Sequence, residues 1–392
     1  MRFWGVRLAS IAGGIGLAVL IHWIALSQLS AFGVRLVVLA GLYVTLAVSL
    51  NLINGITGQF SIGHAAFYQV GAYAAGLFTV KVFSSQPLTF MLWVPVAMIV
   101  GAVVASAAGL LVGLPSLRLR GDYLAIVTLG FGEIIRILSQ NLKVVGAASG
   151  MAIEPKMLSQ SPMVWLCWLL AIGSIALCRN LLQTAHGLSF LAVREDEIAS
   201  SAMGINVTRT KVAAFVLGSA LAGAAGGFYA HYEGFLIPTQ FGMEVSFIIL
   251  TMVVLGGSGS ITGSVIAAVA LSALPELLRN IKTIPLATVI GLTIGVIAAV
   301  SLGRRWSEQL HGPVRDRVLK LSGLTGLCLG GGYLLGLGLR ALPALSEATT
   351  DGNRIRMVIF AGTLVLLMLV RPQGVLGHRE FGLGKWLREP AR

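Results

Sequence analysis

The chain consists mainly of long apolar runs separated by short polar or basic stretches. A hydrocarbon core about 30 Å thick is crossed by a helix of about 20 apolar residues, so each long run predicts a membrane span. The run at 245–257 is short for a crossing alone, and Gly256, Gly257 and Gly259 break it, which predicts a re-entrant or discontinuous element. The predicted spans are residues 8–29, 33–55, 62–83, 90–114, 122–140, 163–178, 211–232, 245–257, 260–279, 284–302, 318–339 and 355–371.

This pattern predicts an all-α integral membrane protein, a polytopic helical bundle of about 10–12 transmembrane segments with broken or re-entrant helices. Residues 1–392 form a single transmembrane domain in this interpretation, because the loops are too short for a catalytic domain. The first apolar run follows Arg2 and Arg7 and is longer than the apolar region of about 7–15 residues in a signal peptide. We interpret it as a retained span, and a cleaved signal peptide remains the alternative.

Composition supports the same class. Apolar residues make up 56% of the chain and charged residues 11%, whereas soluble domains carry about 25% charged residues. The net charge of +13 does not indicate nucleic acid here, because groups of basic residues between apolar runs, at 118–120, 179–211, 304–320 and 371–388, are typical of cytoplasmic loops. Counting crossings from a cytoplasmic N-terminus puts all four groups on the cytoplasmic side. We therefore expect a multi-pass protein of the bacterial inner (plasma) membrane, surrounded by lipid, with both termini cytoplasmic.

Motifs for catalysis are absent from the sequence. It contains no P-loop, no H-E-x-x-H, no G-x-S-x-G and no cluster of His, Cys or carboxylates. Cys167, Cys178 and Cys328 lie in apolar runs and are interpreted as packing residues. We expect no catalytic residue, no metal site and no cofactor bound by this chain.

A polar interruption between the second and third spans is the first candidate site. Polar residues there are costly in a bilayer unless they face a partner, a cavity or water. The segment is either a broken helix that lines a translocation path or a polar turn at the membrane face. His64 has no metal-type partner nearby. The pathway or hinge candidates are Gly58, Ser61, Gly63 and His64, together with Gly256, Gly257 and Gly259 of the later break.

The fifth predicted span carries the second set of pathway candidates. Gly121 and Asp122 resemble a helix start, with the Asp side chain capping free N–H groups. Glu133 and Arg136 stand three residues apart on one helix face and can form an ion pair. Such a pair either lines a substrate route or only stabilises the structure, and the structural role is slightly favoured. The candidates are Asp122, Tyr123, Thr128, Glu133 and Arg136.

The third candidate is the loop that begins with four successive charged residues at Arg194. We predict a short amphipathic helix that begins with this run and stops at Gly204 on the cytoplasmic side. A helix of this kind suits docking into a groove of a cytoplasmic partner, whereas a solvated connecting loop is the simpler interpretation. The candidate residues are Arg194, Glu195, Asp196, Glu197, Ala199, Met203 and Gly204.

Taken together, these segments resemble the LivM-type permease subunits of ABC importers for branched-chain amino acids. The resemblance covers about residues 33–280 and 355–378. The blocks that carry it are NLINGITGQFSIGHAAFYQVGAYAA (51–75), RLRGDYLAIVTLGFGEIIR (118–136), FLAVREDEIASSAMGINVTRTKVAAFVLGSALAGAAGGFYAHYEG (190–234), VVLGGSGSITGSVIAAV (253–269) and RPQGVLG (371–377).

The resemblance implies a division of labour among several chains. The loop at 194–204 resembles the coupling helix that docks on an ATPase, although four residues separate Ala199 from Gly204, one more than in the simplest family pattern. The implied partners are a second related permease, two cytoplasmic ATPase subunits and a periplasmic or extracellular solute-binding protein. ATP and Mg²⁺ are expected on the ATPases only, and this chain would form half of the translocation pathway.

One stretch departs from the family pattern. Residues 281–354, with two additional apolar segments, separate the family-like core at 33–280 from the terminal span at 355–378. We predict that this stretch is an inserted helical hairpin with a basic cytoplasmic loop. Three other functions remain open: a urea or short-chain amide importer permease, a secondary transporter that works without ATPases, and a membrane enzyme acting on lipid-linked substrates. The last two need intramembrane carboxylates or a catalytic cluster, which are not evident.

Overall fold

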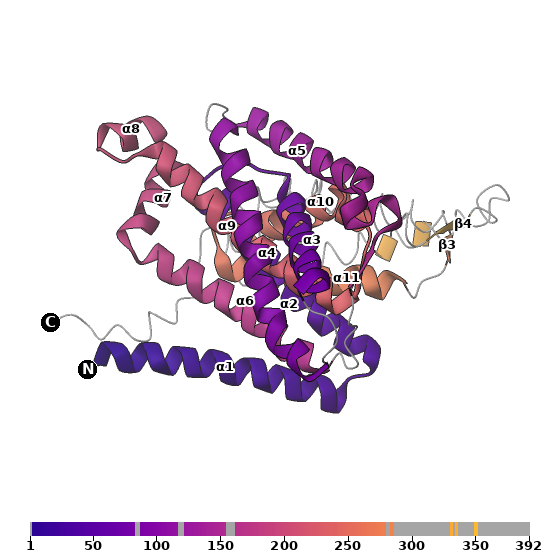
Figure 1. Ribbon diagram of the computed structural model, residues 1–392. Helices are drawn as coiled ribbons and strands as arrows, with labels where there is room; N and C mark the ends of the chain where they lie inside the picture. The colour runs from indigo at the N-terminus through magenta and orange to yellow at the C-terminus, as the bar shows by residue number, and fades with distance from the viewer. Residues whose placement is uncertain are drawn as a thin grey trace. The chain divides into compact units, whose positions relative to one another are not determined.

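The computed structural model of the chain describes residues 2–82, 87–116, 121–153, 161–279, 283–285, 330–331, 334–335 and 349–351. The described residues up to Ala273 form one compact unit, and those from Leu274 onward belong to a second, so each is described by itself. The first unit is built almost entirely of helices within its described residues, which confirms the all-α fold class (Figure 1).

Nearly all of the described apolar runs are regular α-helices. In chain order they are α1 (Arg2–Gln28), α2 (Ala31–Asn51), α3 (His64–Val82), α4 (Pro87–Ser116), α5 (Asp122–Asn141), α6 (Ser161–Leu182), α7 (Ala185–Glu195), α8 (Glu197–Ala202), α9 (Val207–Glu233), α10 (Met243–Gly256) and α11 (Ile261–Arg279). A π-helix, η1 (Leu52–Ile56), continues α2, and the 3₁₀ turns are η2 (Lys143–Val145), η3 (Ala147–Ser149) and η4 (Pro238–Phe241).

Strands are short within the described residues. In the first unit β1 (Met151–Ala152) pairs antiparallel with β2 (Phe235–Leu236), which holds the loop after α5 against the end of α9. In the second unit β3 (Thr283–Pro285) pairs antiparallel with β4 (Thr349–Asp351).

Among the residues that the structure describes, six helical segments are long and apolar enough to cross a membrane. They are Ala31–Ile56, Trp93–Leu114, Tyr123–Asn141, Met163–Leu182, Val207–Glu233 and Pro238–Gly256, and Gly13–Gln28 and Ile261–Ala273 are shorter apolar helices. Large apolar side chains such as Ile99, Val103 and Leu111 of α4 are exposed, as expected of a surface that faces lipid rather than water. The chain is therefore a multi-pass membrane protein, as predicted.

The centre of the first unit is the packing of α3, α4 and α9. The three backbones meet at Gly71, Gly101 and Gly223: a Cβ on Gly101 would lie 2.8 Å from the carbonyl oxygen of Gly71 and 2.9 Å from that of Gly223. Small residues allow this close approach, because helices in lipid associate through packing rather than through exclusion of water. Many of the scattered glycines of the sequence therefore serve as contact points between helices.

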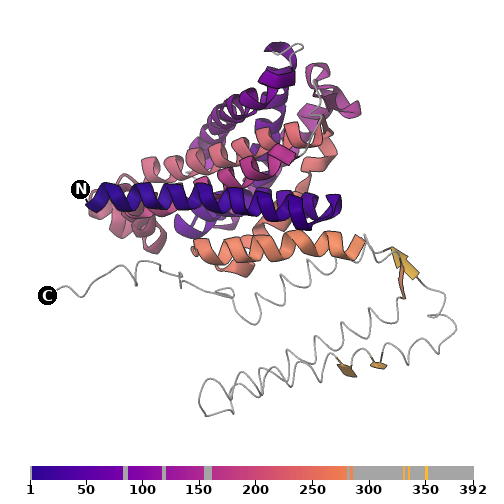
Figure 2. The same cartoon turned by 90° about the horizontal axis from the view of Figure 1, so that it is seen from below.

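Helices α2, α6 and α1 pack in turn beside this centre. Two bonds join α6 to α2: Trp168 Nε1 donates to the carbonyl oxygen of Val37 at 3.1 Å, and the Cys167 thiol lies 3.3 Å from that of Val38. Helix α1 packs on α6 and crosses the front of the unit in Figure 2, whereas α7 and α8 project from one end of it in Figure 1. The buried Cys167 confirms its interpretation as a packing residue.

Two sequence predictions need correction. The run at 245–257 is not too short to cross, because η4 extends it to a segment of 19 residues at Pro238–Gly256. The charged run at 194–197 does not begin one helix but is divided between two. Arg194 and Glu195 end α7, and Asp196 is extended (φ −157°, ψ 115°), so that its carboxylate caps the start of α8.

Several predictions lie outside the described residues. The spans at 284–302, 318–339 and 355–371, and hence most of the predicted hairpin at 281–354, belong to this part of the chain. The domain boundaries and the count of about 10–12 crossings therefore stay predictions.

Candidate functional site

The first break in the bundle separates α2 from α3. The last turn of α2 widens into the π-helix η1, and a left-handed Gly58 (φ +74°) begins the extended stretch that leads to α3. The side chain of Asn54 in η1 binds the backbone of Ser61 at the other end of this stretch. Its amide nitrogen donates to the carbonyl oxygen of Ser61 at 3.0 Å, and its amide oxygen accepts from the N–H of Ser61 at 3.1 Å. One side chain thus replaces the partners that a helical backbone would supply. The segment is a broken helix and not a simple turn.

The second break separates α10 from α11. Gly257 (φ +110°) and Gly259 (φ +94°) have backbone angles that side-chain-bearing residues rarely adopt. Ser260 then caps α11, because its hydroxyl accepts from the N–H of Gly263 at 3.1 Å. Gly256 lies so close to Gly263 that a Cβ on either would overlap the other's backbone. The glycine cluster thus forms a tight turn between two packed helices.

The two breaks contact one another. The amide oxygen of Asn51, the last residue of α2, accepts from the N–H of Gly259 at 2.8 Å. Gly55 of η1 packs on the same turn, since a Cβ there would lie 2.9 Å from the Cα of Gly259. The predicted hinge residues Gly58 and Gly259 therefore belong to one junction, although they are distant in the sequence.

The α7–α8 loop is anchored beside this junction. The carboxylate of Asp196 caps α8 by accepting from the N–H groups of Ile198 (2.8 Å) and Ala199 (3.0 Å). Glu197 forms an ion pair with Lys211 of α9, whose side chain is almost fully buried. The carbonyl oxygen of Lys211 in turn accepts from the side chain of Gln59 at 3.3 Å.

The predicted loop residues have different surroundings. Glu195, Asp196, Ala199, Met203 and Gly204 are exposed, and Gly204 (φ +84°) makes the turn that ends α8. The side chains of Ile198 and Met203 are 72% and 83% exposed, so the loop presents apolar groups beside its charges. Arg194 points the other way: it donates from Nη1 to the carbonyl oxygen of Gly55 at 3.0 Å.

Helix α5 approaches the first break from a third side. The hydroxyl of Thr128 accepts from the N–H of Ile62 at 3.1 Å, and a Cβ on Gly63 would overlap the Thr128 carbonyl. Glu133 and Arg136 form the predicted ion pair, with Oε2 2.7 Å from Nη2, and both side chains are partly exposed. Tyr123 faces outward. Gly121 precedes the predicted start of α5 at Asp122, and the side chain of Asp122 lies outside the described residues.

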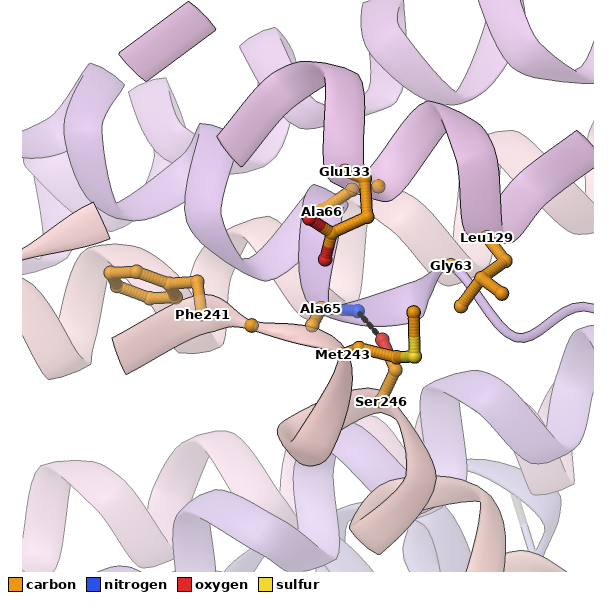
Figure 3. Close-up of a pocket in the computed structure, with 10 residues that line it drawn as sticks. Gly63, Ala65, Ala66, Leu129, Glu133, Phe241, Met243 and Ser246 are labelled. Carbon is orange, nitrogen blue, oxygen red and sulfur yellow. Dashed lines mark hydrogen bonds between the residues drawn. The ribbon is translucent and has the colours of Figure 1, made fainter. Parts of the chain in front are cut away.

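A small cavity lies between α3, α5 and α10 (Figure 3). Its volume is about 10 Å³, which is room for about one water molecule. The carboxylate of Glu133 points toward Ala65 and Ala66 in Figure 3, and the N–H of Ala65 donates to the hydroxyl of Ser246 at 3.1 Å. The space is far too small for a free amino acid, so these helices are closed against each other here.

His64 starts α3 in a buried position. Its Nε2 lies 2.7 Å from the hydroxyl of Ser49 on α2, which ties together the two sides of the break. The described residues contain no group of three or more His, Cys, Asp or Glu side chains that could hold a metal ion. The contact with Ser49 joins His64 to α2, and Ser61, Gly63 and Thr128 lie around the same break.

Sequence reasoning missed the residues that connect these segments. Asn51, Asn54 and Gln59 lie within the polar interruption but not among its site candidates, and Lys211 appears only as a basic residue of the loop. Polar amides within an apolar run signal a need for partners. Which partners they bind depends on contacts between distant parts of the chain.

Residues 33–302 match a protein family described as the permease component of the branched-chain amino acid transport system. The chain belongs to this family. Among its relatives is the high-affinity branched-chain amino acid transport system permease protein LivM of Salmonella typhimurium, 35% identical over 284 residues, which are 64% of this chain and 65% of that protein. LivM of Escherichia coli is 34% identical over 292 residues, or 67% of each chain.

A more distant relative in the family is the high-affinity permease protein LivH of Salmonella typhimurium, 24% identical over 252 residues, which are 60% of this chain and 81% of LivH. The chain thus spans about two thirds of the length of the LivM proteins that it matches. No solved structure matches it.

Proposed function

We propose that this chain is the permease subunit of an ATP-binding-cassette importer and forms half of the translocation pathway for branched-chain or similar neutral amino acids. The family match over residues 33–302 carries the proposal. The names of the LivM and LivH relatives, which are branched-chain amino acid permeases, supply the substrate class. The proposal includes a second related permease, two ATPases on the cytoplasmic side and a solute-binding protein on the other.

The α7–α8 loop is the proposed docking element for an ATPase. A short helix with exposed apolar side chains suits a groove on a partner, and Ile198 and Met203 are such side chains. A shallow hollow of about 490 Å³ beside them is lined by Glu197, Ile198, Ser201, Ala202 and Val207. The Asp196 cap and the ion pair of Glu197 with Lys211 hold α8 in a fixed position relative to α9. A displacement of α8 by an ATPase would therefore also displace α9.

Helix α5 is the proposed wall of the pathway. Only 22% of the residues in its most apolar stretch are buried, the lowest share among the six candidate spans. The helix also carries the partly exposed Glu133–Arg136 ion pair. Ionisable residues within a membrane face other protein or water rather than lipid. A second permease that covers α5 would place this pair at the shared interface, where the two charges of an amino acid zwitterion have complementary partners.

The energy source is proposed to lie on other chains. ATP and Mg²⁺ would bind to the ATPase subunits, and this chain would bind no cofactor. Closure of the ATPases would move the coupling loops, and the pathway between the two permeases would open alternately to either side. We place the protein in the bacterial inner membrane with both termini in the cytoplasm, because the basic loops then obey the positive-inside rule.

Reconstitution in liposomes tests the proposal. The chain with its second permease, two ATPases and binding protein should import leucine, isoleucine or valine in the presence of internal ATP and Mg²⁺. A complex lacking this chain serves as the control, and urea and short-chain amides complete the solute panel. Uptake without the ATPases, or appreciable ATP hydrolysis by the purified chain alone, would contradict the proposal.

A further inference from the structure

Arg194 joins three segments that are far apart in the chain. Its Nη1 donates to the carbonyl oxygen of Gly55 at 3.0 Å, a carbonyl of the π-helical turn at the first break. A Cβ on Gly259, in the turn of the second break, would lie 2.7 Å from the same Nη1. A Cβ on Gly58 would lie 2.8 Å from Cγ of Arg194. The side chain therefore fills the space that Gly58 and Gly259 leave beside it.

Arg194 lies at the joint between α7 and α8, so its contact connects the loop to the first break. It is part of the last turn of α7, and Asp196, two residues later, caps α8. Its Nη2 and Nε both donate to Glu195, at 2.8 Å and 3.2 Å, so one planar group binds the loop on one side and the break on the other. Lysine lacks this divided set of donors.

We propose that Arg194 is a positioning residue that transmits movement of the α7–α8 loop to both breaks, rather than a contact for the ATPase. This role rests on the proposed function of the loop as the docking element. Two connections run from the loop to the first break, and a third joins that break to the second. Arg194 binds Gly55, Asn51 ties Gly259 to α2, and Lys211 connects Glu197 to Gln59. A displaced loop cannot keep its bonds unless η1 moves with it, and the bond of Asn51 then carries the movement to the turn at Gly259.

Hydrogen exchange on the full chain in lipid nanodiscs tests the contact without any need for transport. Arg194→Ala should speed exchange of the N–H of Gly259, and of the N–H groups of residues 55–59, by about ten- to hundredfold, because loss of the charge-assisted bond to the Gly55 carbonyl loosens η1 and, through Asn51, the turn at Gly259. Arg194→Lys should give a smaller increase. The control is Arg209→Ala, which removes a charge from an exposed position near the same loop. Unchanged exchange in Arg194→Ala, or an equal change in Arg209→Ala, would overturn the proposal.

A pair of glycine variants tests the same contact in a chain that keeps its arginine. Gly58 and Gly121 both have positive φ (+74° and +58°), so alanine is strained at either position. Only at Gly58 would the new Cβ push against Arg194, since Gly121 has open space around it. Gly58→Ala should reproduce the faster exchange of Gly259 and Gly121→Ala should not. Equal effects of the two variants would assign the change to backbone strain and overturn the proposal.

The assembled transporter provides the functional readout. In Arg194→Ala the number of solute molecules imported per ATP hydrolysed should fall about tenfold, within the usual range of coupling between sites, while the amount of assembled complex stays unchanged. A lower rate with an unchanged ratio would indicate a merely structural role and overturn the proposal. If the wild-type complex imports no amino acid, the proposed function fails, and the exchange experiments still decide the contact.

Discussion

The packed centre and the junction of the two breaks are held together in different ways. At the centre, α3, α4 and α9 meet backbone to backbone through Gly71, Gly101 and Gly223. At the junction, Gly55 packs on the turn at Gly259, and polar side chains add hydrogen bonds to single backbone groups, as Arg194 does to Gly55. Close packing resists displacement in every direction. A few hydrogen bonds to backbone groups can be exchanged for others, so the junction is the part of the unit suited to movement.

The largest expected effect follows from disruption of the centre. Gly71→Leu forces a side chain into the backbone of Gly223, and overpacking of this kind costs about 3 kcal/mol or more. The variant should fail to give a monodisperse protein in detergent, as measured by size-exclusion chromatography and thermal unfolding. Gly173→Leu is the matched control, because nothing lies within 4 Å of a Cβ at Gly173. Equal loss in both variants would show that the centre is no more tightly packed than the periphery.

Loss of the ion pair beside the junction should have the next largest effect. Glu197→Gln leaves the buried ammonium of Lys211 without its charged partner, which costs about 1.5–3 kcal/mol. Combined with Gly204→Ala, it should separate ATP hydrolysis from uptake while the protein still inserts into the membrane. Uptake and ATPase assays on the same vesicles measure this. Unchanged uptake in the double variant would count against a coupling role for the loop.

A smaller effect is expected within the first break. Asn54→Leu removes both bonds to Ser61 and should cost about 1–3 kcal/mol, with faster hydrogen exchange at the N–H of Ser61. Asn54→Asp keeps the acceptor and loses the donor, so its exchange should be intermediate. If the N–H of Ser61 exchanges equally fast in Asn54→Asp and Asn54→Leu, the bond from this N–H to the side-chain oxygen at position 54 does not stabilise the break.

The smallest change in stability is expected at the surface of α8. Ile198→Ala and Met203→Ala alter exposed side chains, so the free energy of unfolding should stay within about 0.5 kcal/mol of the wild-type value. Binding to the ATPase subunits should nevertheless weaken by about tenfold, as expected when an anchor residue is truncated. Exposed Leu188→Ala on α7 is the control. Unchanged ATPase affinity in both α8 variants would remove this face from the proposed docking surface.

The sequence predicts the helices well, because the length of an apolar run reflects the thickness of the bilayer that it crosses. The predicted spans 90–114 and 122–140 correspond to α4 and α5. The break at 51–64 is also predictable, since polar residues interrupt an otherwise apolar stretch. Helix α7 was not predicted, because its composition of apolar and polar residues resembles a loop when it is considered alone.

Contacts within the candidate site are harder to predict. Glu133 and Arg136 are three residues apart on one helix, so helical geometry alone predicts their ion pair. The same reasoning cannot find the bond between Asn51 and Gly259, because no local rule places α2 beside the α10–α11 turn. The roles of the site residues in transport stay predictions, and the variants above are designed to decide them.

The junction also sets an order on biosynthesis. Asn51 and its partner Gly259 are separated by 208 positions, and Arg194 stands 139 positions after Gly55. Because a ribosome delivers the chain from its N-terminus, the first break enters the membrane long before either partner exists. Until the α10–α11 turn has been synthesised, the side chain of Asn51 lacks its native partner and must bind water or the insertion machinery. A chain truncated before residue 259 cannot form this bond, so its first break should be more sensitive to proteolysis.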